Sequence, residues 1–267
     1  MSTRTRRIFP AAGLLAILLF TFGAKAEMTN ALSDAEIRGR QLAQQLCAGR
    51  PPGDSTNTGV LKIRDKNGHH SEIPVNCEVI VLGTNSNWEG IYEAKTTNQS
   101  VTLLVIHGAD QLNGYFYSTN SAIRVPILSD IPMLGHLFHS HQFNGAELMA
   151  PFAGSDFWIA DLGLEFFHWP EQKILKKEFR RNCSCLVLES TNPNPATNGY
   201  SRVDSWIDEE SGGIVMGRAY DAPGRLLKEF YPKDVKKVNG QWQAESMEID
   251  NIQTGSRTRL DFDLKAP

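Results

Sequence analysis

Short stretches in which apolar and polar residues alternate recur along most of this chain, separated by turn-forming residues. In one of them Leu61 and Ile63 alternate with two basic residues, and an Asp-Lys-Asn-Gly turn follows at residues 65–68. A period of two places one set of side chains on each face of a strand. The pattern predicts roughly ten to twelve such strands. The simplest architecture is therefore mainly β, a single strongly curved antiparallel sheet.

Two segments are predicted to be helical instead. Ser33 and Glu36 have the spacing of a capping box, at the start of a helix that runs to Leu46. Asp156 could cap a short second helix, which would carry much of the apolar stretch at residues 152–169.

The first 26 residues have the pattern of an export signal. A basic start is followed by an apolar run at residues 11–22 and by Ala-Lys-Ala before Glu27. The run is shorter than the roughly 20 apolar residues that a membrane-spanning helix needs, although an uncleaved N-terminal anchor is the alternative. The Arg6-Arg7 pair also resembles a twin-arginine signal. We expect cleavage of residues 1–26, and a single domain at residues 27–267 in the periplasm.

The charge balance argues against a nucleic-acid partner. The 267 residues contain 27 basic and 30 acidic side chains, and four of the basic ones lie in the predicted signal, which has no acidic residue. The remaining chain is therefore acidic and shows no basic stripe, which nucleic-acid binding requires. The full chain has 41% hydrophobic residues, enough to bury a sizeable core. We expect a monomer.

Motifs of catalysis are missing from the sequence. It contains no phosphate-binding glycine loop, no nucleophile elbow and no zinc-protease motif, so we expect no enzyme and no cofactor. His136, His139 and His141 form a weak candidate metal site, whose alternative is an exposed histidine-rich loop. A hydrolase or metalloenzyme would need these histidines to converge with a carboxylate.

Four cysteines, Cys47, Cys77, Cys183 and Cys185, allow three disulfide pairings, and the sequence does not choose among them. Export makes a disulfide plausible. Cys183 and Cys185 are two apart on a predicted strand, so they point to opposite faces and should not pair with each other. The alternative for each cysteine is a buried free thiol.

The densest apolar stretch outside the signal, residues 152–169, is apolar on more than one side. It is therefore either ordinary core between layers or the lining of a cavity. A cavity here would suit an acyl chain, because each buried CH₂ contributes about 0.8 kcal/mol without a polar partner. The residues predicted to line it are Leu61, Ile63, Phe152, Phe157, Trp158, Leu162, Phe166, Phe167, Val203, Leu260 and Phe262.

The second half of the chain carries a series of short motifs in a fixed order. They are Phe152-Ala153-Gly154-Ser155-Asp156-Phe157, Asp161-Leu162-Gly163, Cys185-Leu186-Val187-Leu188-Glu189, Gly199-Tyr200-Ser201-Arg202-Val203, Trp206-Ile207-Asp208, Gly224-Arg225-Leu226-Leu227-Lys228, Gly240-Gln241-Trp242, and Asn251 with Gln253-Thr254-Gly255. This series resembles the outer-membrane lipoprotein-sorting protein family, relatives of the LolA and LolB periplasmic lipoprotein carriers. The resemblance covers residues 152–264, and the first half fits more loosely.

The resemblance implies an unclosed β-barrel of about eleven strands, with helices as a lid over a hydrophobic cavity. It implies no catalysis, and as partners it implies acyl chains and the lipoprotein transport components of the inner and outer membranes. The leading hypothesis is a periplasmic carrier or binding protein for lipid-modified proteins or free lipids. The alternative is an envelope sensor or scaffold of the same fold, which would bind another protein through an exposed apolar patch.

Overall fold

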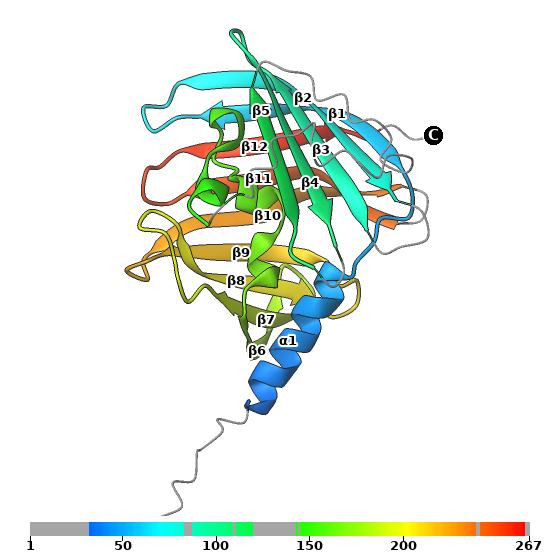
Figure 1. Cartoon of the computed structure of the whole chain (residues 1–267), viewed down its shortest axis with the longest axis vertical. Coiled ribbons are helices and arrows are strands. Elements are labelled where there is room, and N and C mark those ends of the chain that lie inside the picture. Colours follow the sequence, from blue (N-terminus) through cyan, green and yellow to red (C-terminus); the bar gives the residue numbers. More distant parts are fainter. Residues whose placement is uncertain are drawn as a thin grey trace, which may run out of the picture. The chain divides into compact units, whose positions relative to one another are not determined.

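Twelve strands form one sheet in the part of the chain that the structure describes (Figure 1). This computed structural model describes residues 32–82, 87–108, 111–119, 143, 145–238 and 241–264; the predicted export signal and the three candidate metal-binding histidines lie outside them. The strands are β1 (Ser55–Arg64), β2 (His70–Val81), β3 (Trp88–Lys95), β4 (Ser100–His107), β5 (Gly114–Thr119), β6 (Glu171–Arg180), β7 (Cys183–Thr191), β8 (Tyr200–Asp208), β9 (Ile214–Asp221), β10 (Leu226–Val238), β11 (Gln241–Asn251) and β12 (Arg257–Asp263).

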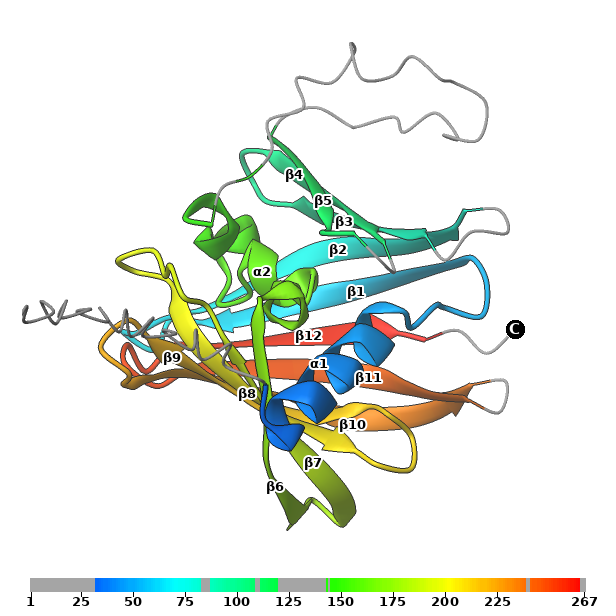
Figure 2. The same cartoon turned by 60° about the horizontal axis from the view of Figure 1, so that its bottom comes forward.

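Neighbouring strands are antiparallel throughout, in the order β5-β4-β3-β2-β1-β12-β11-β10-β9-β8-β7-β6. The first strand pairs with the last, so β1 and β12 join the two halves of the chain. The edge strands β5 and β6 do not pair with each other, and the sheet curls without closing (Figure 2). The prediction of a mainly β, unclosed barrel is confirmed.

The alternation in the sequence explains how the sheet acquires an apolar face. Leu61 is buried and lies opposite Leu260 of β12 and Ile73 of β2, whereas the next residue, Lys62, is exposed. Because the side-chain period of a strand is two, the same register carries the alternation across neighbouring strands. The inner face of the curl therefore becomes the core.

Helix α1 (Asp34–Cys47) begins as the sequence predicts, with a complete capping box. The backbone N–H of Ser33 donates to Glu36 Oε2 at 2.7 Å, and the backbone N–H of Glu36 donates to Ser33 Oγ at 3.4 Å. The helix packs against the edge strand β6. No described helix is both long and apolar enough to cross a membrane.

A chain of short helical pieces, residues 147–169, lies inside the curl, and we call it the plug (Figure 2). It contains the 3₁₀ turns η3 (Glu147–Met149), η4 (Phe152–Gly154) and η5 (Glu165–His168) and one α-helical turn, α2 (Ile159–Leu162). The prediction of one helix capped by Asp156 is wrong. Leu164 has a φ of 50°, which ends α2 before η5 begins.

Candidate functional site

The structure gathers all eleven predicted cavity residues into a single apolar cluster between the plug and the inner face of the sheet. Seven of them are buried: Leu61, Phe152, Phe157, Phe166, Phe167, Val203 and Leu260. The other four, Ile63, Trp158, Leu162 and Phe262, are half-buried and pack against the same cluster. The spatial grouping inferred from the sequence is thus present in the fold, whereas lipid binding by these residues stays a prediction.

The described residues leave little space at the point where the plug meets β1 and β12. A cavity of about 10 Å³ lies between Leu61 and Leu260 on the sheet and Phe152 and Phe157 on the plug. That volume is about what one water molecule needs, and no acyl chain fits into it. The described side chains around this cavity are therefore closely packed, and a lipid that entered at this point would have to displace part of the cover.

A buried lysine holds the plug to the sheet. The side chain of Lys228, on β10, is completely buried, and its Nζ donates to the carbonyl oxygen of Asp156 at 2.6 Å. Nζ also lies 3.5 Å from Asp161 Oδ2 and 3.5 Å from the centre of the Trp158 ring. Burial lowers the pKa of Lys228 to about 8, against the opposing attraction of Asp161 and Asp156. The ammonium is thus stabilised mainly by groups of the plug.

Asp161 organises the plug end of this contact. Its Oδ2 accepts the backbone N–H of Trp158 at 2.8 Å, which starts α2, and its Oδ1 accepts the hydroxyl of Tyr200 at 2.9 Å. The rings of Trp158 and Tyr200 stack with centroids 4.6 Å apart. Burial and the Asp161 charge raise the pKa of Tyr200 well above its ordinary value, so the phenol stays protonated and donates.

Asp156 attaches the plug to a third strand. Its Oδ2 accepts the hydroxyl of Thr258 on β12 at 2.9 Å, its Oδ1 accepts the hydroxyl of Ser256 at 2.6 Å, and its backbone N–H donates to Thr258 Oγ1 at 2.9 Å. The carboxylate that was expected to cap a helix is therefore bonded across the molecule. Together with Lys228, these bonds attach the plug at Asp156 to β10 and β12.

Sequence reasoning missed this polar network, and the reason lies in a β-bulge. Strict alternation puts Lys228 and Leu227 on opposite faces, so only one of them would be buried. The β9–β10 register shifts between Leu226 and Lys228, and both Leu227 and Lys228 are buried. The one available signal was that Asp156, Asp161, Tyr200 and Lys228 fall inside the motifs that carry the family resemblance.

A second polar group lies where the plug meets β5. Tyr115 donates its hydroxyl to Glu165 Oε2 at 2.8 Å, and the amide of Asn113 donates to the carbonyl oxygen of Gly163 at 2.7 Å. Burial raises the pKa of Glu165 to about 7, and the hydrogen bonds from Tyr115 and Asn113 oppose the shift. Burial, with repulsion from a neighbouring histidine, lowers the pKa of His107 to about 4.

Cys47, at the end of α1, lies beside a histidine of the plug, with its Sγ 3.6 Å from Nε2 of His168. Burial and the nearby Glu165 raise the pKa of the Cys47 thiol to about 11, so the group is not an activated nucleophile.

All four cysteines are free thiols in this structure. Among the described residues no group of three or more His, Cys, Asp or Glu side chains is placed to hold a metal ion.

The contact between α1 and the sheet depends on small residues. Gly39 and Ala43 are the buried residues of the helix, while Leu42, Leu46 and Cys47 are half-buried against the core. A Cβ atom at position 39 would lie 2.5 Å from the Cα of Lys173 on β6, so only glycine permits this approach. No large apolar side chain of α1 is fully buried, which makes the helix the weaker part of the cover.

Solved structures with the same arrangement support this description of the fold. A structure described as an outer membrane lipoprotein-sorting protein domain, from Vibrio parahaemolyticus, aligns with a TM-score of 0.65 and 20% identity, over 85% of this chain and 91% of its own. This chain has the same fold as that domain. A DUF1329 family protein from Desulfovibrio piger also has a TM-score of 0.65, with 18% identity over 86% of this chain and 92% of its own.

Two further comparisons cover overlapping parts of the chain. A family model described as an uncharacterized protein matches residues 137–264, which include the motifs in the second half of the chain. A LolA superfamily protein from Nitrosomonas europaea aligns more loosely, with a TM-score of 0.49 and 14% identity over 85% of this chain and 91% of its own. No curated protein matches the sequence.

Proposed function

We propose that this protein is a periplasmic, non-catalytic carrier or binding protein for the acyl chains of lipids or lipid-modified proteins. The observation that carries the proposal is the continuous apolar cluster between the plug and the inner face of the sheet, covered at β6 by a helix whose buried residues are Gly39 and Ala43. The likeness to a lipoprotein-sorting domain supports it. The export pattern at residues 1–26 supports the location.

Energetics favour α1 as the part that moves. Burying an acyl chain contributes about 0.8 kcal/mol for each CH₂, so a chain of about a dozen carbons offers on the order of 10 kcal/mol. Displacing α1 exposes mainly glycine, alanine and half-buried side chains, whereas displacing the plug would break the contacts of Lys228 and Asp156. We therefore propose that ligands enter beside α1 while the plug stays in place.

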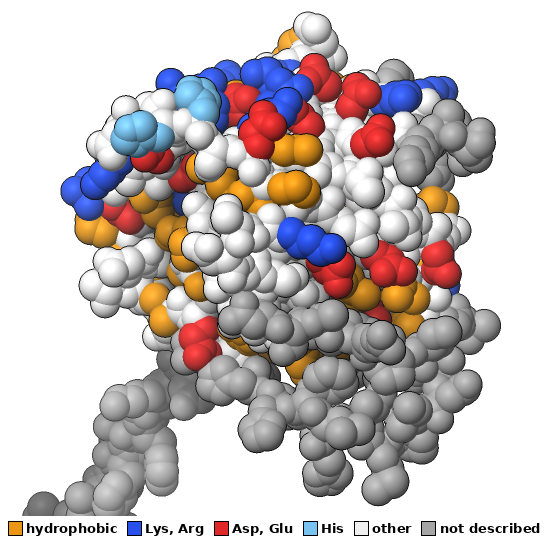
Figure 3. Space-filling model, turned by 90° about the horizontal axis from the view of Figure 1, so that it is seen from above, with side chains coloured by type: hydrophobic (Ala, Val, Ile, Leu, Met, Phe, Trp, Pro, Cys, Tyr) orange, Lys and Arg blue, Asp and Glu red, His pale blue; other side chains and the backbone are white. Residues whose placement is uncertain are grey.

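The alternative, a protein-binding sensor or scaffold of the same fold, needs an exposed apolar patch. Among the described residues, the large exposed apolar side chains are spread over several elements, with Leu175 and Phe179 both on β6 and Val235 on β10. Figure 3 shows one face on which charged side chains of both signs alternate with hydrophobic ones. These observations favour the carrier.

Native mass spectrometry of the mature protein, purified from a bacterial host without detergent, tests the proposal. We expect a population whose mass exceeds that of the chain by the mass of one lipid. This population should disappear after the protein is unfolded in urea and refolded without lipid. Adding lipid back should restore the complex and speed hydrogen exchange in α1 but not in the plug. A protein that neither carries nor takes up lipid would exclude the carrier and favour the scaffold.

A further inference from the structure

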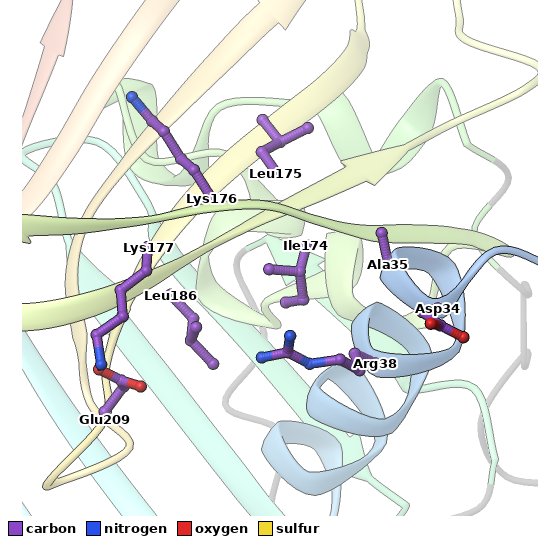
Figure 4. A pocket seen from close by; sticks show the side chains of 9 residues that line it. All are labelled: Asp34, Ala35, Arg38, Ile174, Leu175, Lys176, Lys177, Leu186 and Glu209. Atoms are coloured by element: carbon purple, nitrogen blue, oxygen red, sulfur yellow. The ribbon is translucent and has the colours of Figure 1, made fainter.

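A groove of about 560 Å³ runs between the first half of α1 and the inner face of β6 and β7 (Figure 4). Ile174 and Leu186 form its floor, and Arg38 extends from α1 toward them. Lys177 and Glu209 stand on the far side of the floor. The volume falls within the usual range of about 300–1,000 Å³ for small-molecule sites.

The floor of the groove is continuous with the apolar interior. Ile174 is a buried member of the core cluster, and Leu186 packs against that cluster. Leu188, opposite Ile174 in the β6–β7 ladder, is completely buried. An apolar chain lying on this floor would thus point toward the plug. The groove is therefore an exposed edge of the apolar surface that the plug covers further inside the curl.

Three cationic side chains line the groove, and two of them are already paired, because Lys176 binds Glu178 and Lys177 binds Glu209. Glu209 already binds Lys177 at 2.6 Å and accepts the hydroxyl of Ser184 at 2.7 Å. Arg38 is exposed and forms no ion pair within 4 Å in the described part of the chain, although it attracts Glu209 at longer range. The carboxylate of Asp34 points away from Arg38. A planar guanidinium above an apolar floor matches an anionic group attached to a hydrocarbon chain.

We infer that this groove binds the head of an anionic amphiphile, with its acyl chain on Ile174 and Leu186 and its carboxylate or phosphate on Arg38. The inference rests on the proposed carrier function and names its ligand class and point of entry. Lys177 gives long-range attraction but is held by Glu209. Arg38 therefore selects charged amphiphiles over neutral ones with the same chain.

Calorimetric titration of the mature protein with dodecanoate, dodecyl phosphate and the neutral monolauroylglycerol tests this inference. Arg38→Gln should weaken binding of the anionic ligands by about fivefold, the upper end for a surface ion pair. It should leave monolauroylglycerol unchanged. Arg40→Gln is the matched control, since Arg40 is also exposed on α1 but lines a different groove, beside Cys47 and His168. Leu186→Ala should weaken all three ligands alike.

The outcomes separate this inference from the carrier proposal. If the unsubstituted protein binds these lipids but Arg38→Gln and Arg40→Gln behave alike, the groove is not the head-group site and the carrier proposal stands. Equal affinity for dodecanoate and monolauroylglycerol would also refute selection by charge. A larger Arg38 effect on dodecyl phosphate than on dodecanoate would identify a lipid phosphate as the natural head group. Binding of none of the three would contradict the carrier proposal itself.

Discussion

Replacement of Lys228 by Met tests whether the buried network fixes the plug. Methionine keeps the length and apolar stem of lysine but removes the ammonium. The change deletes the bond to the Asp156 carbonyl, the contact with Asp161 and the position over the Trp158 ring. It also leaves the Asp161 carboxylate, which is 5% exposed, without a counter-ion.

The expected loss is about 3 kcal/mol of unfolding free energy. Breaking a buried ion pair by removing one partner costs roughly 3–5 kcal/mol. The lower end applies for two reasons. Asp161 keeps its hydrogen bonds from Trp158 and Tyr200. Removing the ammonium also removes the cost of burying that charge, the same cost that lowers the pKa of Lys228 to about 8. The double variant Lys228→Met/Asp161→Asn removes both charges and should be more stable than Lys228→Met alone.

Urea unfolding at pH 6.5, where folded Lys228 is charged, measures both variants. Lys66→Met is the control, because Lys66 is exposed in the turn between β1 and β2 and should shift stability by at most about 0.5 kcal/mol. Hydrogen exchange should show faster opening of the plug in Lys228→Met. A loss below about 1 kcal/mol, or a double variant less stable than the single one, would refute the role given to Lys228.

Two further substitutions test the cover of the apolar interior. The pKa of Glu165 rises from 4.5 to about 7 on folding, so between these pH values the folded state holds a proton that the unfolded state has lost. The free energy of unfolding therefore falls as the pH rises through that window. Glu165→Gln should remove a cost of about 3 kcal/mol above pH 7 and none at pH 4.5. Urea unfolding at both pH values checks this against exposed Glu171→Gln, and an equal gain at both would contradict it. Gly39→Ala should cost about 1–3 kcal/mol and speed hydrogen exchange in α1, because the new methyl group meets the β6 backbone. Exposed Gln41→Ala is its control, and a stabilised Gly39→Ala would show that helix propensity outweighs the clash.

The strands and α1 could be predicted because their signals are local. The capping box at Ser33 and Glu36 and the alternation around Leu61 each depend on a few consecutive residues, and the structure confirms both. The grouping of the eleven apolar residues was also predictable, because the inner face of a curved sheet and a helical segment inside it bury each other.

The path of the plug could not be predicted from local signals. Asp156 has the residue type and position of a helix cap, yet its carboxylate bonds to Thr258, 102 residues away. The left-handed conformation of Leu164, which divides the segment, is one that leucine rarely adopts, so the residue type gave no signal for it. The close packing around Leu61, Phe152 and Phe157 could not be predicted either, since the same side chains could line a void or close it, and the pattern of apolar residues is identical in both cases.

The position of the polar network around Lys228 also explains what a match to the motifs of residues 152–264 indicates. Asp156, Asp161, Tyr200 and Lys228 each fall within one of those motifs, and each bonds the plug to the sheet or shapes its helical turn. Residues with that role preserve the fold whatever ligand is carried, so a match across these motifs identifies an architecture rather than a substrate. In the proposed carrier, we expect selection among ligands by charge to come from residues outside the motifs, on surfaces that do not hold the fold together. Arg38 on α1 occupies such a surface, which makes its substitution the more informative test of what this protein binds.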